Sequence, residues 1–160
     1  MKRLLAVLAI VVLVAGGYYW FMREQKAGPA EGAAAEQSQI IRGEYLARIG
    51  DCFACHTERG GQPYAGGLEM QTPFGSLYTT NITPDPETGI GKWSAEDFWR
   101  ALHEGKSKDG SFLYPGMPFN NYTYVTRADS DAIYAYFMSL KPVKQKSRPH
   151  EMGFPRARWA

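Results

Sequence analysis

The sequence predicts a small all-α domain, with about three main helices joined by long loops, preceded by one transmembrane helix. Three segments place apolar residues every three to four positions, the period of an amphipathic helix. Outside them, residues 76–79 alone indicate a short strand. One apolar run near the N-terminus has the length of a bilayer span. The chain is expected to divide into a membrane segment at 1–23, a flexible linker at 24–38, a folded domain at 39–145 and a basic tail at 146–160.

The composition is that of a folded protein with little net charge. Of 160 residues, 44% are hydrophobic, and the net charge is +2, which argues against a general nucleic-acid binder. The charge is uneven: residues 39–140 carry −4, whereas residues 141–160 carry +5. This asymmetry favours electrostatic steering by the domain or contact of the tail with an acidic surface, although a solvated basic end is the simpler interpretation.

The N-terminal run, Leu4–Met22, holds no charged residue. Its 19 residues match a bilayer better than the shorter apolar region of a signal peptide. Lys2 and Arg3 precede it and should stay cytoplasmic. We expect a single-pass anchor in a bacterial inner membrane, with the domain on the periplasmic side. A signal peptide cleaved near Ala15–Gly17 is the alternative, and it also exports the domain.

The remaining elements follow in order. Residues 24–38 are rich in Ala, Gly and Glu without an apolar stripe, which predicts a flexible tether. The first helix of the domain is expected at about 39–50. The second should begin at Ser94, where Asp97 completes a capping box, and should stop at Gly105. The third should begin near Thr126 and end before Pro142.

The loop Thr57–Lys92 is unusually long for a compact domain. Such a loop needs something to pack against, and a large bound cofactor can replace the missing protein core. The sequence therefore favours a cofactor beside this loop.

The segment Cys52-Phe53-Ala54-Cys55-His56 has the spacing of a c-type haem attachment site. Two thiols three residues apart can meet two porphyrin vinyl groups, and the adjacent imidazole can then reach the iron. A redox dithiol normally lies in a βαβ unit, and a zinc site needs a second ligand pair. Neither context is present, so the segment predicts one covalent haem with His56 as an axial ligand.

Met117 is the predicted second axial ligand. It lies in Leu113-Tyr114-Pro115-Gly116-Met117-Pro118, where two prolines stiffen the loop and Gly116 allows a close backbone approach. A rigid loop that presents a soft sulfur suits an iron ligand. A methionine covering apolar surface is the alternative. The other candidates by residue type are Met70, Met138, Met152, His103 and His150.

Four further residues are candidates for contacts with the haem edge or its propionates, because an indole N–H, a phenol or a guanidinium can hydrogen-bond a carboxylate. They are Tyr78, Trp93, Trp99 and Arg100. Each could equally be a core or helix-face residue. Asn81-Ile82-Thr83 and Asn121-Tyr122-Thr123 match the N-glycosylation pattern, and turn residues are the favoured interpretation.

The stretches GEYLARIGDCFACHT, GGLEMQTPFGSLYTTNITPDPETGIGKWSAEDFWRALHEG and LYPGMPFNNYTYV resemble the first haem domain of bacterial membrane-bound alcohol and gluconate dehydrogenase cytochrome c subunits. The resemblance covers about residues 39–145. It implies a cytochrome c fold, thioether links at Cys52 and Cys55, and His56 and Met117 on the iron. It also implies that electrons come from a periplasmic dehydrogenase.

Those subunits carry three attachment motifs, whereas this sequence has one. Their chain of haems and any quinone site are therefore not expected here. The expected function is a membrane-tethered one-electron carrier, not an enzyme, that passes electrons from the dehydrogenase to a terminal oxidase or another cytochrome. A peroxidase-like haem enzyme, or a redox or gas sensor with an open sixth iron position, is the alternative.

Overall fold

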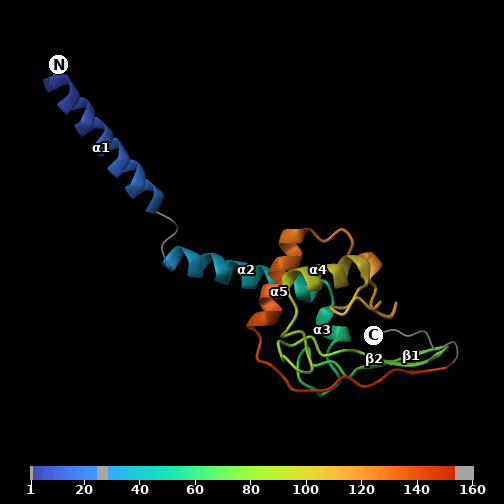
Figure 1. The fold of residues 1–160 in the computed structure, drawn as a ribbon. Helices are drawn as coiled ribbons and strands as arrows, with labels where there is room; N and C mark the ends of the chain where they lie inside the picture. Colours follow the sequence, from blue (N-terminus) through green and yellow to red (C-terminus); the bar gives the residue numbers. More distant parts are fainter. Residues whose placement is uncertain (1, 25–28, 154–160) are drawn as a thin grey trace. The chain divides into compact units, whose positions relative to one another are not determined.

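The computed structural model describes residues 2–24 and 29–153 of the chain. The chain divides into two compact units, residues 1–37 and 38–160, and each is described by itself. Figure 1 shows the elements, which in chain order are α1 (Lys2–Glu24), α2 (Pro29–Ile49), α3 (Cys52–Cys55), β1 (Glu69–Thr72), β2 (Gly75–Tyr78), α4 (Ala95–Glu104), the 3-10 helix η1 (Phe119–Asn121), α5 (Arg127–Ser139) and β3 (Glu151–Met152).

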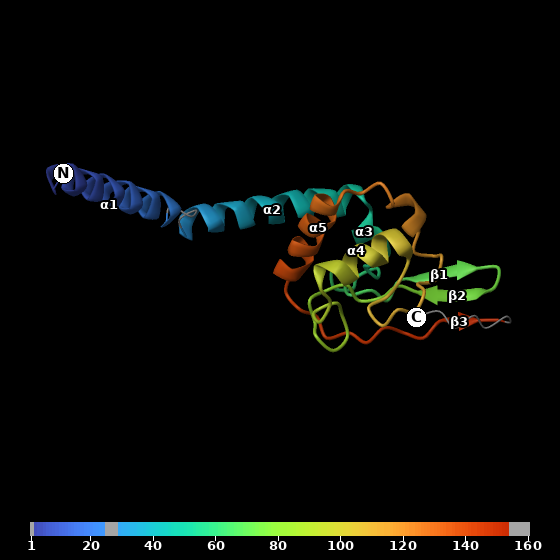
Figure 2. The same ribbon diagram turned by 45° about the horizontal axis from the view of Figure 1, so that its top comes forward.

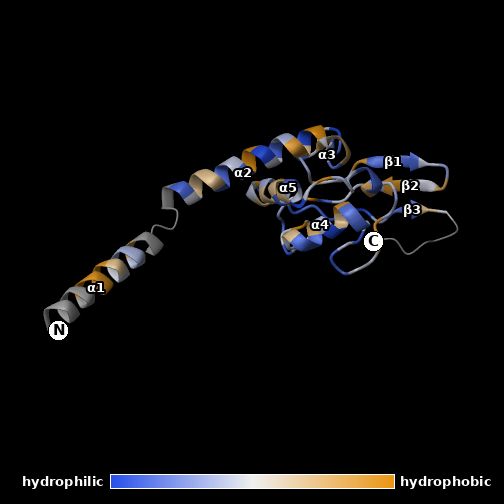
Figure 3. Ribbon diagram, turned by 90° about the horizontal axis from the view of Figure 1, so that it is seen from above, coloured by the Kyte–Doolittle hydropathy of each residue, from blue (hydrophilic) through white to orange (hydrophobic). Residues whose placement is uncertain are grey.

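The apolar N-terminal run is helical, because Leu4–Met22 falls entirely within α1. Its large apolar side chains between Ile10 and Phe21 are exposed, and Figure 3 colours the middle of α1 as hydrophobic. Among the residues that the structure describes, no helix meets the length and hydropathy of a membrane span.

Helix α2 is longer than the sequence indicated. The expected tether at 24–38 is helical from Pro29 onward, and the domain helix predicted at about 39–50 is the second half of the same helix. Alanine, glutamate and glutamine are strong helix formers, and proline fits the first helical position. Local propensity therefore forms a helix here without the apolar stripe on which the prediction depended. Residues 25–28 lie outside the described part of the chain.

In the second unit, α2 and α5 cross at very short distance. A Cβ built on Gly43 would lie 1.9 Å from the carbonyl oxygen of Ala132, so only glycine fits at this crossing. Around the crossing, α2, α4 and α5 share one buried apolar cluster, and Figure 2 shows α4 beside α5. Helices α4 and α5 supply five of its buried side chains, Phe98, Leu102, Ile133, Tyr136 and Phe137, and Tyr64 and Ile90 from the long loop also belong to it.

The ends of α4 and α5 confirm the predicted start and stop signals. The Ser94 side chain accepts a hydrogen bond from Asp97 N, and the Asp97 carboxylate accepts from Ser94 N, which completes the capping box. Gly105 ends α4 in the left-handed conformation at φ 61°. At α5, the Thr126 side chain accepts a hydrogen bond from Asp129 N.

Removing the Asp97 carboxylate should weaken the domain in a pH-dependent way. Hydrogen bonds from Ser94 hold the pKa of Asp97 below its ordinary value, so its contribution exists above the unfolded pKa of about 3.9 and is lost as pH falls through the folded value. Asp97→Asn should cost about 1 kcal/mol at pH 7, measured by urea unfolding, and the difference should shrink toward pH 3. Glu104→Gln, at an exposed pair with Lys106, is the control and should change little.

The structure corrects the all-α prediction, because the domain also contains a small antiparallel sheet in the order β1-β2-β3. The strand expected at 76–79 is present as β2, which pairs with β1 through Glu69↔Tyr78 and Thr72↔Gly75. Strands β1 and β3 are four and two residues long, too short for an alternating pattern to stand out in the sequence. The domain is mostly helical, with the sheet at one end (Figure 2).

The segment after α5 packs on the domain, although the domain was expected to end at 145. Asn81 Nδ2 donates to the carbonyl oxygens of Val143 (2.8 Å) and Gln145 (3.2 Å), and Asn81 N donates to Ser147 Oγ (3.3 Å). Strand β3 then pairs with β2. These contacts are made mostly by backbone atoms, so the basic composition of the segment gave no sign of them. Residues 154–160 of the predicted tail lie outside the described residues.

Candidate functional site

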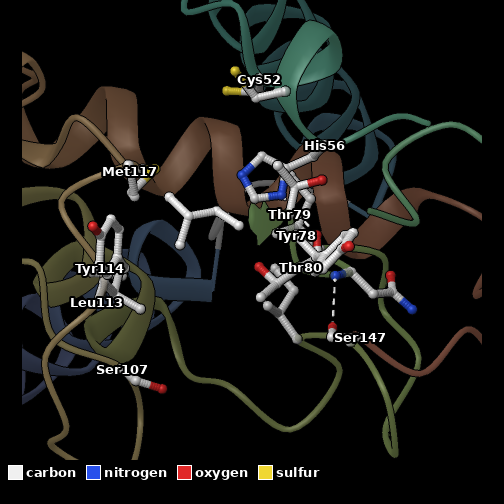
Figure 4. Close-up of a pocket in the computed structure, with 18 of the residues that line it drawn as sticks. Cys52, His56, Tyr78, Thr79, Thr80, Ser107, Leu113, Tyr114, Met117 and Ser147 are labelled. Carbon is white, nitrogen blue, oxygen red and sulfur yellow. Dashed lines mark hydrogen bonds between the residues drawn. The ribbon is translucent and has the colours of Figure 1, made fainter. Parts of the chain in front are cut away.

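The second unit contains a cavity of about 300 Å³ with mostly apolar walls. Helix α4, strand β2 and the loop after β2 supply much of the wall, through Leu77, Ile82, Ile90, Phe98 and Leu102. Figure 4 shows that the side chains of Cys52, His56 and Met117 border this cavity. The cavity therefore joins an apolar interior with sulfur and nitrogen donors.

The two cysteines lie on one turn of helix. Asp51 adopts a left-handed conformation at φ 59°, which turns the chain sharply from α2 into the four-residue helix α3. Tyr122 Oη donates to Gly50 O at 2.8 Å and holds this turn in place. Cys52 and Cys55 are three residues apart on α3, and both are free thiols at the cavity wall. Burial raises the pKa of Cys52 to about 11, so this thiol is protonated at neutral pH.

His56 is held in a single tautomer. Its Nδ1 lies 2.7 Å from the carbonyl oxygen of Thr80, and a carbonyl oxygen can only accept, so Nδ1 carries the proton. Burial also lowers the pKa of His56, which favours the neutral ring. Nε2 is then left with a free lone pair, the form of imidazole that binds a metal.

Met117 is positioned by a tight turn. Its N–H donates to Tyr114 O at 2.9 Å, and its carbonyl oxygen accepts from Phe119 N at 2.8 Å. At Gly116 the loop lies close to β2, since a Cβ there would be 2.9 Å from Leu77 Cδ1. Figure 4 shows Met117 and His56 on different sides of the cavity. The loop thus presents a thioether to the same space that the imidazole faces.

The other methionines and histidines separate into two groups. Met70 and His150 line the cavity, whereas Met138, Met152 and His103 are not among the residues that line it. Met138 packs against the core cluster. His103 stacks on Trp99 with ring centroids 3.4 Å apart, and its two ring nitrogens lie within 3.0 Å of carbonyl oxygens.

Only two of the four candidate haem-edge residues line the cavity. Tyr78 and Trp93 line the cavity, but Trp99 and Arg100 do not. Trp99 stacks on His103 and lies 5.6 Å below the Arg127 guanidinium. Arg100 pairs with Asp97 at 2.7 Å on the same helix. The four were proposed from the hydrogen-bonding chemistry of their side chains, which does not determine the direction in which Trp99 and Arg100 point from α4.

The C-terminal segment brings two polar residues to the cavity, Ser147 and His150. Sequence reasoning missed Ser147, and it named His150 only as a candidate ligand by residue type while assigning it to a tail outside the domain. No local pattern marks them, since they depend on contacts with Tyr78 and Asn81, more than 60 residues earlier. Asn81, in the first of the two N-glycosylation matches, is 3% exposed, and its Oδ1 accepts from Thr83 N at 2.9 Å, the hydrogen bond of an Asx turn.

These residues fit a covalent haem. One cavity wall has two free thiols on a single helical turn, followed by an imidazole with a bare nitrogen, and a thioether borders the same space. The remaining walls are largely apolar, as a porphyrin face requires. The donor set thus matches the chemistry of a c-type haem, with sulfur for attachment and nitrogen and sulfur for the iron.

Known proteins share this sequence over most of its length. One of the subunits of nicotinate dehydrogenase from Pseudomonas putida is 54% identical over 118 residues, 74% of this chain and 10% of that protein. The gluconate 2-dehydrogenase cytochrome c subunit of Pantoea cypripedii is 50% identical over 127 residues, 78% of this chain and 29% of that protein.

The cytochrome c subunit of a quinone-type alcohol dehydrogenase from Gluconobacter oxydans is 48% identical over 134 residues, 82% of this chain and 28% of that protein. The chain thus spans between 10% and 29% of these three relatives. No protein-family model matches it. The resemblance drawn from the motifs is confirmed: over most of its length the chain is homologous to the cytochrome c subunits of alcohol and gluconate dehydrogenases, and these relatives imply a covalent haem c.

Proposed function

We propose that this chain is a one-electron carrier that holds one haem c through Cys52 and Cys55, with His56 and Met117 as the iron ligands. The observation that carries this proposal is the convergence of two free thiols, a bare imidazole nitrogen and a thioether on one apolar cavity. Haem iron bound there would supply the Fe(III)/Fe(II) couple, which takes up or releases one electron without making bonds to a substrate.

Each residue has a separate task. The thiols of Cys52 and Cys55 would hold the haem by adding to its two vinyl groups, with sulfur bonded to one vinyl carbon and the thiol hydrogen transferred to the other. His56 offers Nε2 while Thr80 O holds its Nδ1–H. Met117 would supply the second ligand of the iron, and a thioether ligand raises the reduction potential. Closure at this position favours electron transfer over the peroxidase-like and sensor alternatives, both of which need open iron.

The proposed partners follow from the relatives. Their names describe cytochrome subunits of dehydrogenases, so we propose a periplasmic dehydrogenase as the electron donor. A terminal oxidase or another cytochrome is the proposed acceptor. Contacts of this kind are small and transient, and they suit a carrier that must leave one partner to reach the next.

We also propose that α1 tethers the domain to the bacterial inner membrane, with the domain in the periplasm. The uncharged run Leu4–Met22, the preceding Lys2 and Arg3, and the aromatic residues Tyr18, Tyr19 and Trp20 at its far end support this orientation. The intact mass of the mature protein tests it. Retention of residues 1–23 with extraction only by detergent supports the tether, and loss of these residues supports a cleaved signal.

Met117→Ala tests the proposed iron site. The ferric wild type should display the weak long-wavelength absorption band of sulfur bound to iron, and the variant should lose it while keeping covalent haem. Loss of the thioether should lower the equilibrium constant for reduction by a factor on the order of ten or more. Each factor of ten corresponds to a fall of about 59 mV in the midpoint reduction potential. Potentiometric titration of the purified haem protein measures this change.

Two matched variants serve as controls. Met138 packs against the core cluster and does not line the cavity, so Met138→Leu should leave the absorption band and the reduction potential unchanged. Met70→Leu tests the other methionine at the cavity wall and should also retain the band. If Met70→Leu loses the band and Met117→Ala keeps it, the assignment of Met117 fails. A wild type without covalent haem after expression with maturation machinery would refute the proposed function as a whole.

A further inference from the structure

His150 lies in the wall of the cavity, and residues before and after it in the sequence are attached to the domain. Upstream, Ser147 Oγ accepts a hydrogen bond from Asn81 N. Downstream, Glu151 pairs with Ser76 in the β2–β3 ladder. These two attachments are four residues apart, so the intervening backbone has little freedom. His150 is therefore a built part of the cavity and not a mobile residue of the basic tail.

The hydrogen bond at Nδ1 determines the tautomer of His150. Its Nδ1 lies 3.2 Å from the backbone nitrogen of Tyr78, and an N–H group can only donate. Nδ1 must therefore be unprotonated, and the proton of the neutral ring resides on Nε2. His56 is in the opposite state, because its Nδ1 faces a carbonyl oxygen. The two histidines of the cavity thus offer opposite chemistry: His56 a lone pair for a metal, and His150 an N–H donor.

The cavity has few groups that can balance a negative charge. Among its lining residues in the described part of the chain there is no lysine or arginine. A haem carries two propionate carboxylates, and a carboxylate taken out of water needs hydrogen bonds or a cation. A haem linked through its vinyl groups to Cys52 and Cys55 would have its propionates at the opposite end of the cavity, where Figure 4 shows Ser107 and Ser147. Ser147 belongs to the same anchored segment as His150.

We propose that His150 donates a hydrogen bond from Nε2–H to a haem propionate and so sets the reduction potential. Nε2 makes no hydrogen bond to the residues that the structure describes, so the donor is available to a carboxylate in the cavity. The inference depends on the haem of the proposed function. Donation to the propionate offsets its negative charge, which otherwise stabilises ferric iron.

The surroundings of His150 leave this donor neutral at pH 7. Burial lowers its pKa below the ordinary value of about 6.5, and the ring therefore acquires its second proton only in acid. Reduced iron favours that proton, so the potential should rise as pH falls through this range. The titratable and charged groups on the elements packed nearby are Tyr78 from β2, Glu69 from β1, Tyr114 from the loop before Met117, and Arg148 and Glu151 from its own segment.

The test compares wild type with His150→Leu and His150→Gln, all as haem-loaded full chains. Leucine removes the donor, whereas glutamine keeps an amide donor and an acceptor for Tyr78 N but cannot titrate. We measure the midpoint potential from pH 4.5 to 8 and the propionate bending band by resonance Raman spectroscopy. His150→Leu should shift the band and lower the equilibrium constant for reduction on the order of tenfold, about 59 mV for one electron. His150→Gln should preserve the band at pH 7 and lose the pH dependence of the potential below about pH 6.5.

Three results would overturn the inference. The first is an unchanged band and potential in His150→Leu. The second is the same change in the leucine and glutamine variants, which would indicate a structural role. The third is an unaltered pH dependence in His150→Gln, which decides the question even if the leucine variant fails to retain haem. Covalent haem and reversible reduction of the wild type are measured first, so a failure of the proposed function is recognised separately.

Discussion

Cys52→Ala/Cys55→Ala should yield a protein without covalent haem whose domain is largely unfolded at 25 °C. The cavity of about 300 Å³ would then lose its occupant. An empty apolar cavity costs about 24 cal/mol per Å³, so the penalty is on the order of 7 kcal/mol before the walls relax. Since a domain of this size has about 5–15 kcal/mol of stability in total, the loss consumes much of it. Far-ultraviolet circular dichroism with urea titration measures the effect.

The single variants provide a graded control. Cys52→Ala and Cys55→Ala each keep one thiol, so each should retain some covalent haem and an intermediate stability. A double variant as stable as wild type would show that the domain does not depend on an occupant of this cavity. Such a result would also remove the explanation given for the long loop Thr57–Lys92.

Gly43→Ala should destabilise the domain by about 3 kcal/mol or more. The new methyl group would lie 1.9 Å from the Ala132 carbonyl oxygen and 2.9 Å from Tyr136 Cβ, so α2 and α5 must move apart. Overpacking of this kind costs about 1–3 kcal/mol, and a contact with backbone belongs at the upper end because backbone cannot rotate away. Urea unfolding of the haem-loaded protein gives the change in free energy.

Gly32→Ala is the matched control in the same helix. A Cβ at Gly32 meets nothing within 4 Å, and alanine has the higher helix propensity. This variant should be as stable as wild type or slightly more stable. If Gly43→Ala behaves like Gly32→Ala, the crossing of α2 and α5 is not as close as described, and the packing of this helix pair would need revision.

Local chemistry accounts for what the sequence predicted well. Ser94, Asp97 and Gly105 act within their own turns, so the start and end of α4 follow from residue type alone. The same holds for the spacing of Cys52, Cys55 and His56. The predicted site residues that line the cavity together, Cys52, Cys55, His56 and Met117, lie in short motifs whose residue order has a stereochemical reason.

The sequence was less informative wherever long-range contacts decide. Residues 146–153 were assigned to a tail because their composition is basic, whereas their placement depends on hydrogen bonds to Asn81 and Tyr78. Trp99 and Arg100 lie on an amphipathic helix whose direction relative to the cavity no local pattern reveals. Strand β3 forms only because β2 offers a free edge.

The attachment of the C-terminal segment also fixes the order in which the site can be completed. The pairing of Ser76 with Glu151 and the bond from Tyr78 N to His150 join residues more than 70 positions apart. They cannot form until His150 and Glu151 have been synthesised, at about 5–20 residues per second. Cys52, Cys55 and His56 emerge much earlier. The wall that contains His150 can consequently form only after the segment that carries Cys52, Cys55 and His56 has already been synthesised.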